Sequence, residues 1–340
     1  MTSRDASADG AIGREAIGPV AFSESPLASR TRLHQAWYRA AILGIEEYGS
    51  SPSRAGPIAR GSVLPPHAAE AGKNFMSPDA FDQYRTRRAQ GWGVDPLRCT
   101  AYMTSSQALT FNLFAPLIRR KDWFCAVLGD LLNIEILELM VAEYEYAPSH
   151  PSLALGDKTR LDMWLVLQTR TGPMSVAVEI KYADRFNSRV LPVWDNERYR
   201  EIREDGRHHW DFSSPAIQSK TINQLLRCHA LATFLRPQAH GPHTRLLILH
   251  HPFDTAAPSL IDQYAAVVTT PELVARHDLI TVFDAMHRHS ANAGEDQEVE
   301  NLAQRYVQFD LSEPTWSSVG LGNSKKLQIG SVSLTPSHSQ

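Results

Sequence analysis

The sequence predicts an α/β protein in which a mixed central β-sheet is flanked by helices and preceded by a helical N-terminal extension. One reason is the order of its segments. A long helical stretch, three strand-like runs, a second helix and a further strand follow one another without a dividing linker. A second reason is the turn sequence TRTGP at residues 169–173, which joins two of the strand-like runs and predicts a hairpin.

The composition indicates a globular protein without a membrane segment. The chain has 340 residues, 43% of them hydrophobic, which is enough for a sizeable core. No apolar run is long enough to cross a bilayer, and residues 1–20 lack the apolar segment of a secretory signal. Three cysteines without metal-ligand spacing fit a reducing compartment, so we expect a cytoplasmic protein. A net charge of −3 argues against an overall basic nucleic-acid binder but allows a local basic groove.

The N-terminal part divides into a lead and an extension. Residues 1–28 are rich in Ala, Ser, Gly and Asp and show no periodicity, which predicts a disordered lead. Residues 29–100 are expected to form a helical and irregular extension. Within it, helical spacing predicts a helix over 32–49, and an N-cap Ser77 followed by Pro78 predicts another over 77–91.

Residues 101–315 form the predicted α/β domain. Apolar spacing predicts a helix over 104–133, which Pro116 divides or kinks. Apolar and β-branched runs predict strands over 136–147, 159–168, 174–182 and 244–251, with a helix over 214–235 before the last of them. Residues 278–286 are expected to be a final strand, 298–311 a final helix and 316–340 a flexible tail.

One strand carries charges where a buried strand should have none. In residues 174–182 Glu179 and Lys181 share a strand face, because side chains alternate along a strand and residues two apart point the same way. Asp162 lies near the start of the preceding strand. If the two strands pair as the short turn predicts, Asp162 and Glu179 become neighbours near one end of the sheet.

Two converging carboxylates indicate a metal site. Without a cation they would repel each other and raise one pKa. Mg²⁺, with Mn²⁺ as an alternative, binds one or two carboxylates and keeps several waters, and it can lower the pKa of a bound water. Lys181 could orient that water or offset negative charge in the transition state. Phosphodiester hydrolysis requires this combination of an acid-bound metal, a water and a cation.

These residues resemble the signature of the PD-(D/E)xK nuclease superfamily, which is an Asp followed by Glu-x-Lys on the next strand. The chain is also similar to a bacterial group in that superfamily assigned as restriction endonucleases. The similar blocks, in order, are SSQALTFNLFAPL, EYEYAP, GDKTRLDMWL, VEIKYADRF and INQLLRCHALA. The resemblance runs from about residue 74 to about residue 235 and is weaker beyond.

The resemblance implies a restriction-endonuclease-like core and Mg²⁺-dependent cleavage of DNA, of a restriction or defence type. It implies Asp162, Glu179 and Lys181 as the catalytic trio, with Asp162 and Glu179 also binding the metal. The carbonyl of Ile180 is implied as a further metal ligand. Gln224 matches a helix glutamine that some members place near the site.

The chain departs from the family pattern in one acid. Many members supply a further acid from the helix before the first strand, but here that helix offers Gln107 and Asn112 and no Glu. The acid is therefore expected from EYEYAP, where Glu143 and Glu145 share a strand face. We prefer Glu145 as an additional metal ligand, and the sequence leaves open Glu143 or neither.

Two other interpretations stay open at this point. The chain could be a nuclease-fold protein that binds nucleic acid or a protein partner without cutting, although the intact trio favours an enzyme. It could also be a metal-free structural domain in which Glu179 and Lys181 form a surface pair. The sequence does not decide between DNA and RNA, and it leaves the oligomeric state open, a homodimer included.

Overall fold

The structure is a computed structural model that describes residues 12–20, 25–146, 148–184, 186, 190–204, 209–235 and 244–319. A five-stranded sheet lies at its centre, in the order β3-β4-β5-β6-β7. The strands are β3 (Ile136–Tyr146), β4 (Leu161–Thr169), β5 (Gly172–Lys181), β6 (Thr244–His250) and β7 (Val274–Asp278). The first three pair antiparallel and the last three parallel, so the sheet is mixed as predicted.

The hairpin of β4 and β5 confirms the predicted pairing of these two segments. Met163 lies opposite Val178 and Leu165 opposite Val176. Continuing this register by one residue sets Asp162 opposite Glu179. Directly opposite side chains of an antiparallel pair lie on the same face of the sheet, so the two carboxylates belong to one face.

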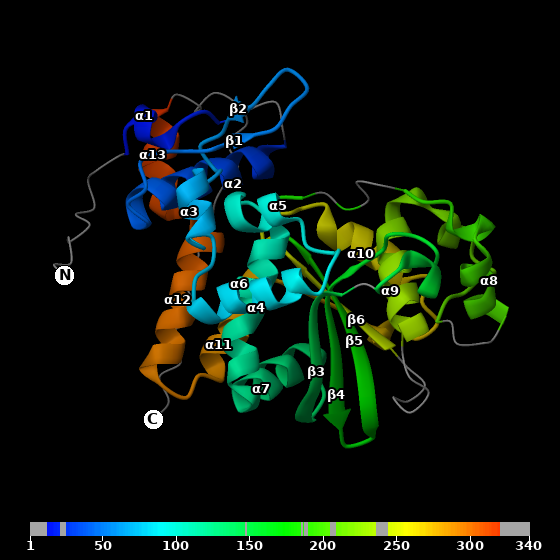
Figure 1. Ribbon diagram of the computed structural model, residues 1–340. Coiled ribbons are helices and arrows are strands. Elements are labelled where there is room, and N and C mark those ends of the chain that lie inside the picture. The colour runs from blue at the N-terminus through cyan, green and yellow to red at the C-terminus, as the bar shows by residue number, and fades with distance from the viewer. Residues whose placement is uncertain are drawn as a thin grey trace.

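Helices cover both faces of the sheet (Figure 1). On one face lie α6 (Ser106–Arg119), α7 (Lys121–Leu132), α11 (Leu279–Arg288) and α12 (Ala293–Tyr306), and their apolar side chains form one core with Val176, Val178 and Ile180. On the other face lie α9 (Asn223–Leu235) and α10 (Ala257–Ala265), which pack against Ala177. Covering both faces explains why β5 is almost continuously apolar.

The long helical stretch is interrupted, but not at Pro116. That proline lies inside α6, and the interruption falls at Arg120, between α6 and α7. Arg120 donates to the Pro116 carbonyl at 3.4 Å and pairs with Glu298 of α12 at 2.6 Å. Its side chain thus satisfies a carbonyl at the end of α6, where helical partners run out.

Two segments differ from the predictions. Residues 278–286 are not a strand: Asp278 caps α11 by accepting from the Thr281 amide at 2.8 Å. Leu279, Val282 and Phe283 then recur at helical spacing and are buried. The last strand of the sheet is β7, which ends at Asp278. The predicted helix over 214–235 is α-helical only from Asn223, because two short 3₁₀ turns, Pro215–Gln218 and Lys220–Ile222, precede it.

The N-terminal extension packs against the end of the chain in Figure 1. The elements of the lead and the extension, in chain order, are α1 (Arg14–Ile17), α2 (Pro26–Trp37), a π-helical turn (Tyr38–Ile42), β1 (Ser50–Ser51), β2 (Ile58–Ala59), α3 (Pro66–Glu70), α4 (Pro78–Ala89) and α5 (Pro96–Ala101). The predicted helix over 32–49 therefore ends early. The predicted start of α4 is confirmed, because Ser77 accepts from the Ala80 amide at 3.1 Å.

The ends of the chain lie only partly within the described residues. Of the lead 1–28, residues 1–11 and 21–24 lie outside them, and the rest contains α1, with a buried Ile17, and the start of α2. Of the tail, α13 (Glu313–Ser318) packs against α2, and residues 320–340 lie outside. The remaining helices are α8 (Glu197–Glu204) and the 3₁₀ turns Pro151–Leu153, Val193–Asp195, Pro271–Leu273 and Phe309–Ser312.

Buried polar side chains join the extension to the sheet. Gln35 of α2 donates to the Tyr182 hydroxyl at 2.8 Å, directly after β5, and to the Arg305 carbonyl at 2.6 Å. Asn112 of α6, which packs on the sheet, donates to the Asn74 carbonyl of the extension at 3.0 Å. The extension is therefore tied to the strand that carries the Glu-x-Lys pair. In the described part of the chain no helix has the length and apolar content of a membrane span.

Candidate active site

A polar cleft of about 540 Å³ opens where β3 and β5 end and β4 begins. Its walls come from these strands, from the start of α6, from α9 and from the segment around α5. All of the predicted side chains, Glu145, Asp162, Glu179, Lys181 and Gln224, line this cleft. Glu143 is not among the lining residues. The structure therefore brings together every side chain that the sequence placed at the site.

Three carboxylates follow one another across three neighbouring strands. Tyr144 lies opposite Met163 and Tyr146 opposite Leu161, so the residue between, Glu145, falls level with Asp162. Asp162 in turn falls level with Glu179. Glu145 has a φ of 44°, a left-handed conformation that is uncommon for a residue other than glycine and marks a local departure from strand geometry.

Asp162 is the central acid of the three. Its Oδ2 accepts a hydrogen bond from the Ile180 amide at 2.6 Å, which ties it to the end of β5. Burial, together with the charges of Glu179 and Glu145, raises the pKa of Asp162 well above its usual value. Lys181 opposes this rise only in part. Without a bound metal ion, the cleft thus disfavours the ionised form of Asp162.

Glu179 is only 2% exposed and both of its oxygens have donors. Its Oε1 accepts from Lys181 Nζ at 2.8 Å and from Gln224 Nε2 at 2.5 Å. Its Oε2 accepts from the Cys228 thiol at 3.3 Å. A surface pair of Glu179 and Lys181, the third interpretation of the sequence, is therefore wrong, because both side chains are buried in the cleft.

Lys181 keeps its charge in spite of burial. Lys181 is 8% exposed, and burial alone would lower the pKa of its amine. The neighbouring Glu179 and Asp162 carboxylates outweigh burial, so the pKa of Lys181 is raised. The amine also lies 5.5 Å from the ring centre of Phe186. The cleft thus holds one fixed cation beside two acids.

Glu145 is the most deeply buried of the three acids, at 1% exposure. Its Oε2 accepts from Gln107 Nε2 at 2.6 Å and lies 4.0 Å from Arg160 Nε. Its Oε1 is buried and has no hydrogen-bond partner among the described residues. Burial raises the pKa of Glu145 to about 7, against the lowering effects of Arg160 and Gln107, while Glu179 adds to the rise.

Sequence reasoning missed two side chains that touch these acids. Gln107, which stands on the helix where the family pattern has an acid, accepts from the Asp95 amide at 3.1 Å and donates to Glu145 Oε2 at 2.6 Å. The available signal was its spacing of four from the buried Phe111, which puts a polar side chain on the apolar face of α6. Cys228 lies among the apolar residues of the predicted helix over 214–235, and no sequence signal sets it apart.

Basic side chains surround the acids. Arg98, Lys158, Arg160 and Arg227 all line the cleft. Arg227 donates to the Thr159 hydroxyl at 2.6 Å and to Asn223 at 3.1 Å, so it is held in place at the wall. A protein with a net charge of −3 thus presents a local group of cations around its acids. Such a distribution suits a polyanion whose backbone approaches the acids.

The donor chemistry of the cleft fits a hard divalent cation. Among the described residues no three His, Cys, Asp or Glu side chains are close enough to form a metal site by themselves. Mg²⁺ and Mn²⁺ do not require three, because oxygen ligands from one or two carboxylates and several waters suffice. Burial, together with the charges of Glu179 and Glu145, raises the pKa of Asp162, so a divalent cation bound by these acids would favour their ionised form.

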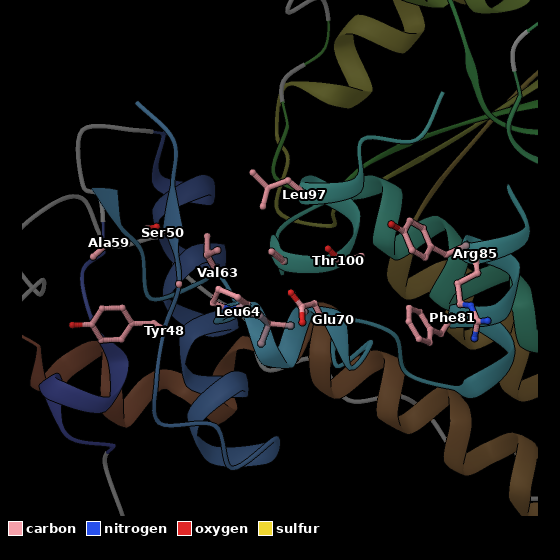
Figure 2. A pocket seen from close by; sticks show the side chains of 15 residues that line it. Tyr48, Ser50, Ala59, Val63, Leu64, Glu70, Phe81, Arg85, Leu97 and Thr100 are labelled. Atoms are coloured by element: carbon pink, nitrogen blue, oxygen red, sulfur yellow. The ribbon is translucent and has the colours of Figure 1, made fainter. Parts of the chain in front are cut away.

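A larger pocket lies elsewhere, within the N-terminal extension, where helices α4 and α5 face the segment of residues 48–70 (Figure 2). Its volume is about 760 Å³ and most of its lining is apolar, including Val63 and Leu64. Figure 2 shows Glu70 near Thr100 in its middle and Arg85 beyond Phe81 at one side. One acid and one base on opposite elements do not form a catalytic group, so the smaller polar cleft is the candidate active site.

The chain belongs to the PD-(D/E)XK nuclease superfamily, because a sequence model of this family matches residues 22–308. The match covers the extension from α2 onward, the whole sheet and all cleft residues named above. No curated protein matches the chain, and no solved structure does. The superfamily consists generally of nucleases, which typically use divalent metal ions, so the family supports a nuclease with a nucleic-acid substrate.

Proposed function

We propose that this protein is a Mg²⁺-dependent DNA endonuclease of a restriction or defence type, with Mn²⁺ as an alternative ion. The observation that carries the proposal is the convergence of Asp162, Glu179 and Lys181 in one polar cleft whose lining includes four further basic residues. Arg98, Lys158 and Arg160 suit the phosphates of a nucleic-acid backbone, which contribute most of its charge-based affinity.

Asp162 and Glu179 are the proposed metal ligands, with the carbonyl of Ile180 as a third. The N–H and C=O of one strand residue point toward the same neighbouring strand. Because the Ile180 amide bonds Asp162, its carbonyl also faces that side. Glu145 is our candidate for an additional ligand or charge, since it lines the same cleft and its Oε1 has no hydrogen-bond partner among the described residues. The bound ion would supply a water of lowered pKa.

The other side chains act on the reacting groups. Lys181, fixed by Glu179, would offset negative charge that develops on the phosphoryl oxygens and help to hold the attacking water in line. Gln224 holds Glu179 Oε1, so its proposed role is to orient a metal ligand. The basic wall residues would position the strand so that the scissile phosphate lies over the two acids.

The direct test is incubation of purified protein with supercoiled plasmid and Mg²⁺, with and without a chelator. We expect nicked or linear DNA only when the free metal is present. A parallel incubation with RNA of similar length decides the substrate class. The protein could instead bind DNA in a titration in Ca²⁺ and never cut it in Mg²⁺ or Mn²⁺. That result would support a nuclease-fold protein that binds without cleaving.

A further inference from the structure

One helix of the cleft holds both oxygens of Glu179. Gln224 and Cys228 are four residues apart on α9 and therefore lie on the same face of that helix, one turn from each other. Gln224 Nε2 donates to Oε1 at 2.5 Å, and the Cys228 thiol donates to Oε2 at 3.3 Å. A carboxylate gripped at both oxygens from one rigid helix has a fixed plane.

The thiol is placed to act as a donor and not as a reactive group. Cys228 is 2% exposed, and its sulfur also lies 3.8 Å from the Arg160 carbonyl. An ordinary thiol has a pKa of about 8.5 and keeps its proton at neutral pH. The Cys228 thiol can therefore donate that proton to Glu179 Oε2.

The two oxygens of Glu179 differ in the strength of their donors. Oε1 receives an ammonium and an amide, whereas Oε2 receives a thiol, which is a weak donor. A cation approaching Glu179 loses least at the oxygen with the weaker donor. Binding of a cation to Oε2 thus sacrifices the least hydrogen-bond energy. The thiol beside Oε2 fixes the orientation of this oxygen.

We propose that Cys228 is a positioning residue that, together with Gln224, clamps the Glu179 carboxylate and presents Oε2 to the divalent ion. This inference rests on the proposed function, because it assigns a role in holding the proposed metal ligand. It makes α9, and not only strands β4 and β5, responsible for the geometry of the metal site. Sulfur does not bind the ion in this account.

The first test measures the thiol itself and needs neither metal nor DNA. The S–H stretching band of a thiol moves to lower frequency when the thiol donates to a carboxylate. We expect one lowered band in the infrared spectrum of the full chain, absent in Cys228→Ala and moved to higher frequency in Glu179→Gln, which replaces the charged acceptor by a neutral amide. A Cys228 band that stays in place in Glu179→Gln overturns the clamp.

The second test measures Mg²⁺ affinity by calorimetry. We expect Cys228→Ala to weaken binding about tenfold, the lower end of the range for residues that orient a metal ligand. Cys228→Ser keeps a donor and should stay within about threefold of the wild type. Cys99→Ala removes another buried thiol, on α5 and outside the cleft, and should leave the affinity unchanged.

The outcomes separate the clamp from the nuclease proposal. Equal Mg²⁺ affinity of Cys228→Ala and wild type overturns the clamp even if the wild type cuts DNA. Equal losses in the Ala and Ser variants also overturn it, since they point to packing alone. If the wild type binds no Mg²⁺, the proposed function fails, while the lowered S–H band still decides whether Cys228 holds Glu179.

Discussion

The polar cleft and the apolar pocket differ in kind although they are similar in size. The cleft of about 540 Å³ gathers acids and bases from strands β3, β4 and β5, whereas the pocket of about 760 Å³ in Figure 2 is lined mainly by apolar side chains. Burial, together with neighbouring acids, raises the pKa values of Asp162 and Glu145 in the cleft. The cleft is therefore the candidate site because of the chemistry of its side chains and not because of its volume.

The comparison predicts its largest effect at Asp162. Asp162→Ala should abolish Mg²⁺ binding, because one of two proposed carboxylate ligands is lost. The fold should persist, since removing one of the crowded acids relieves repulsion when no metal is present. Calorimetry with Mg²⁺ and a thermal melt check both parts. Glu143→Ala, a neighbouring acid outside the cleft, is the matched control. Unchanged affinity in the Asp162 variant would refute the ligand assignment.

Gln224 should have the next largest effect. Gln224→Ala removes the amide that donates to Glu179 Oε1, so we expect cleavage to slow by about 10- to 100-fold. Gln218→Ala changes an equivalent side chain that lies before α9 and outside the cleft, and it should cut at the wild-type rate. Single-turnover cleavage in Mg²⁺ provides the measurement. A Gln224 variant as fast as this control would remove α9 from the catalytic machinery.

Ionisation of Glu145 should make the free energy of unfolding depend on pH. Its pKa rises from 4.5 in the unfolded chain to about 7 in the fold, so the folded state binds the extra proton. Stability therefore falls as pH rises from about 4.5 to about 7. Glu145→Gln removes this loss and should gain up to roughly 3 kcal/mol over the wild type above pH 7 in chelator.

Denaturant unfolding of both proteins from about pH 5 to about pH 8 checks this prediction for Glu145. The difference between variant and wild type should grow with pH. Glu143→Gln serves as the control and should show no such growth. A difference that is constant over the whole range would mean that Glu145 is ionised in the fold at all these pH values.

The smallest effect is expected at the apolar pocket. Glu70→Gln removes the exposed acid seen in Figure 2, and cleavage in Mg²⁺ should stay within about twofold of the wild type, as for most surface changes away from a site. The same single-turnover assay applies. A loss comparable to that of Gln224→Ala would break the comparison, because the pocket would then take part in the reaction.

The cleft could be predicted from sequence because its parts are local. Asp162, Glu179 and Lys181 lie on two strands joined by a short turn, and strand alternation together with hairpin register sets them on one face. Gln107 and Cys228 reach the same cleft from α6 and α9. Their placement depends on how those helices pack across the sheet, which no short-range pattern specifies.

The errors in the fold have the same origin. Residues 278–286 are apolar enough to be a strand. They form helix α11 instead, because Asp278 caps the helix and one helical face is buried. The pocket of Figure 2 is made by separate segments of the extension, α4 and α5 among them, so no single segment predicts it. Local periodicity predicts elements, and long-range packing decides what they enclose.

Lys181 provides the most direct test of the central claim that the cleft hydrolyses phosphodiester bonds. Its amine pairs with Glu179 and should act mainly in the transition state, so Lys181→Ala should lower single-turnover cleavage by about 10² or more. DNA binding in Ca²⁺ should change much less. Lys181→Arg should not restore the rate fully, since a planar guanidinium does not reproduce a compact charge. A Lys181→Ala protein that cuts DNA at the wild-type rate would contradict the account.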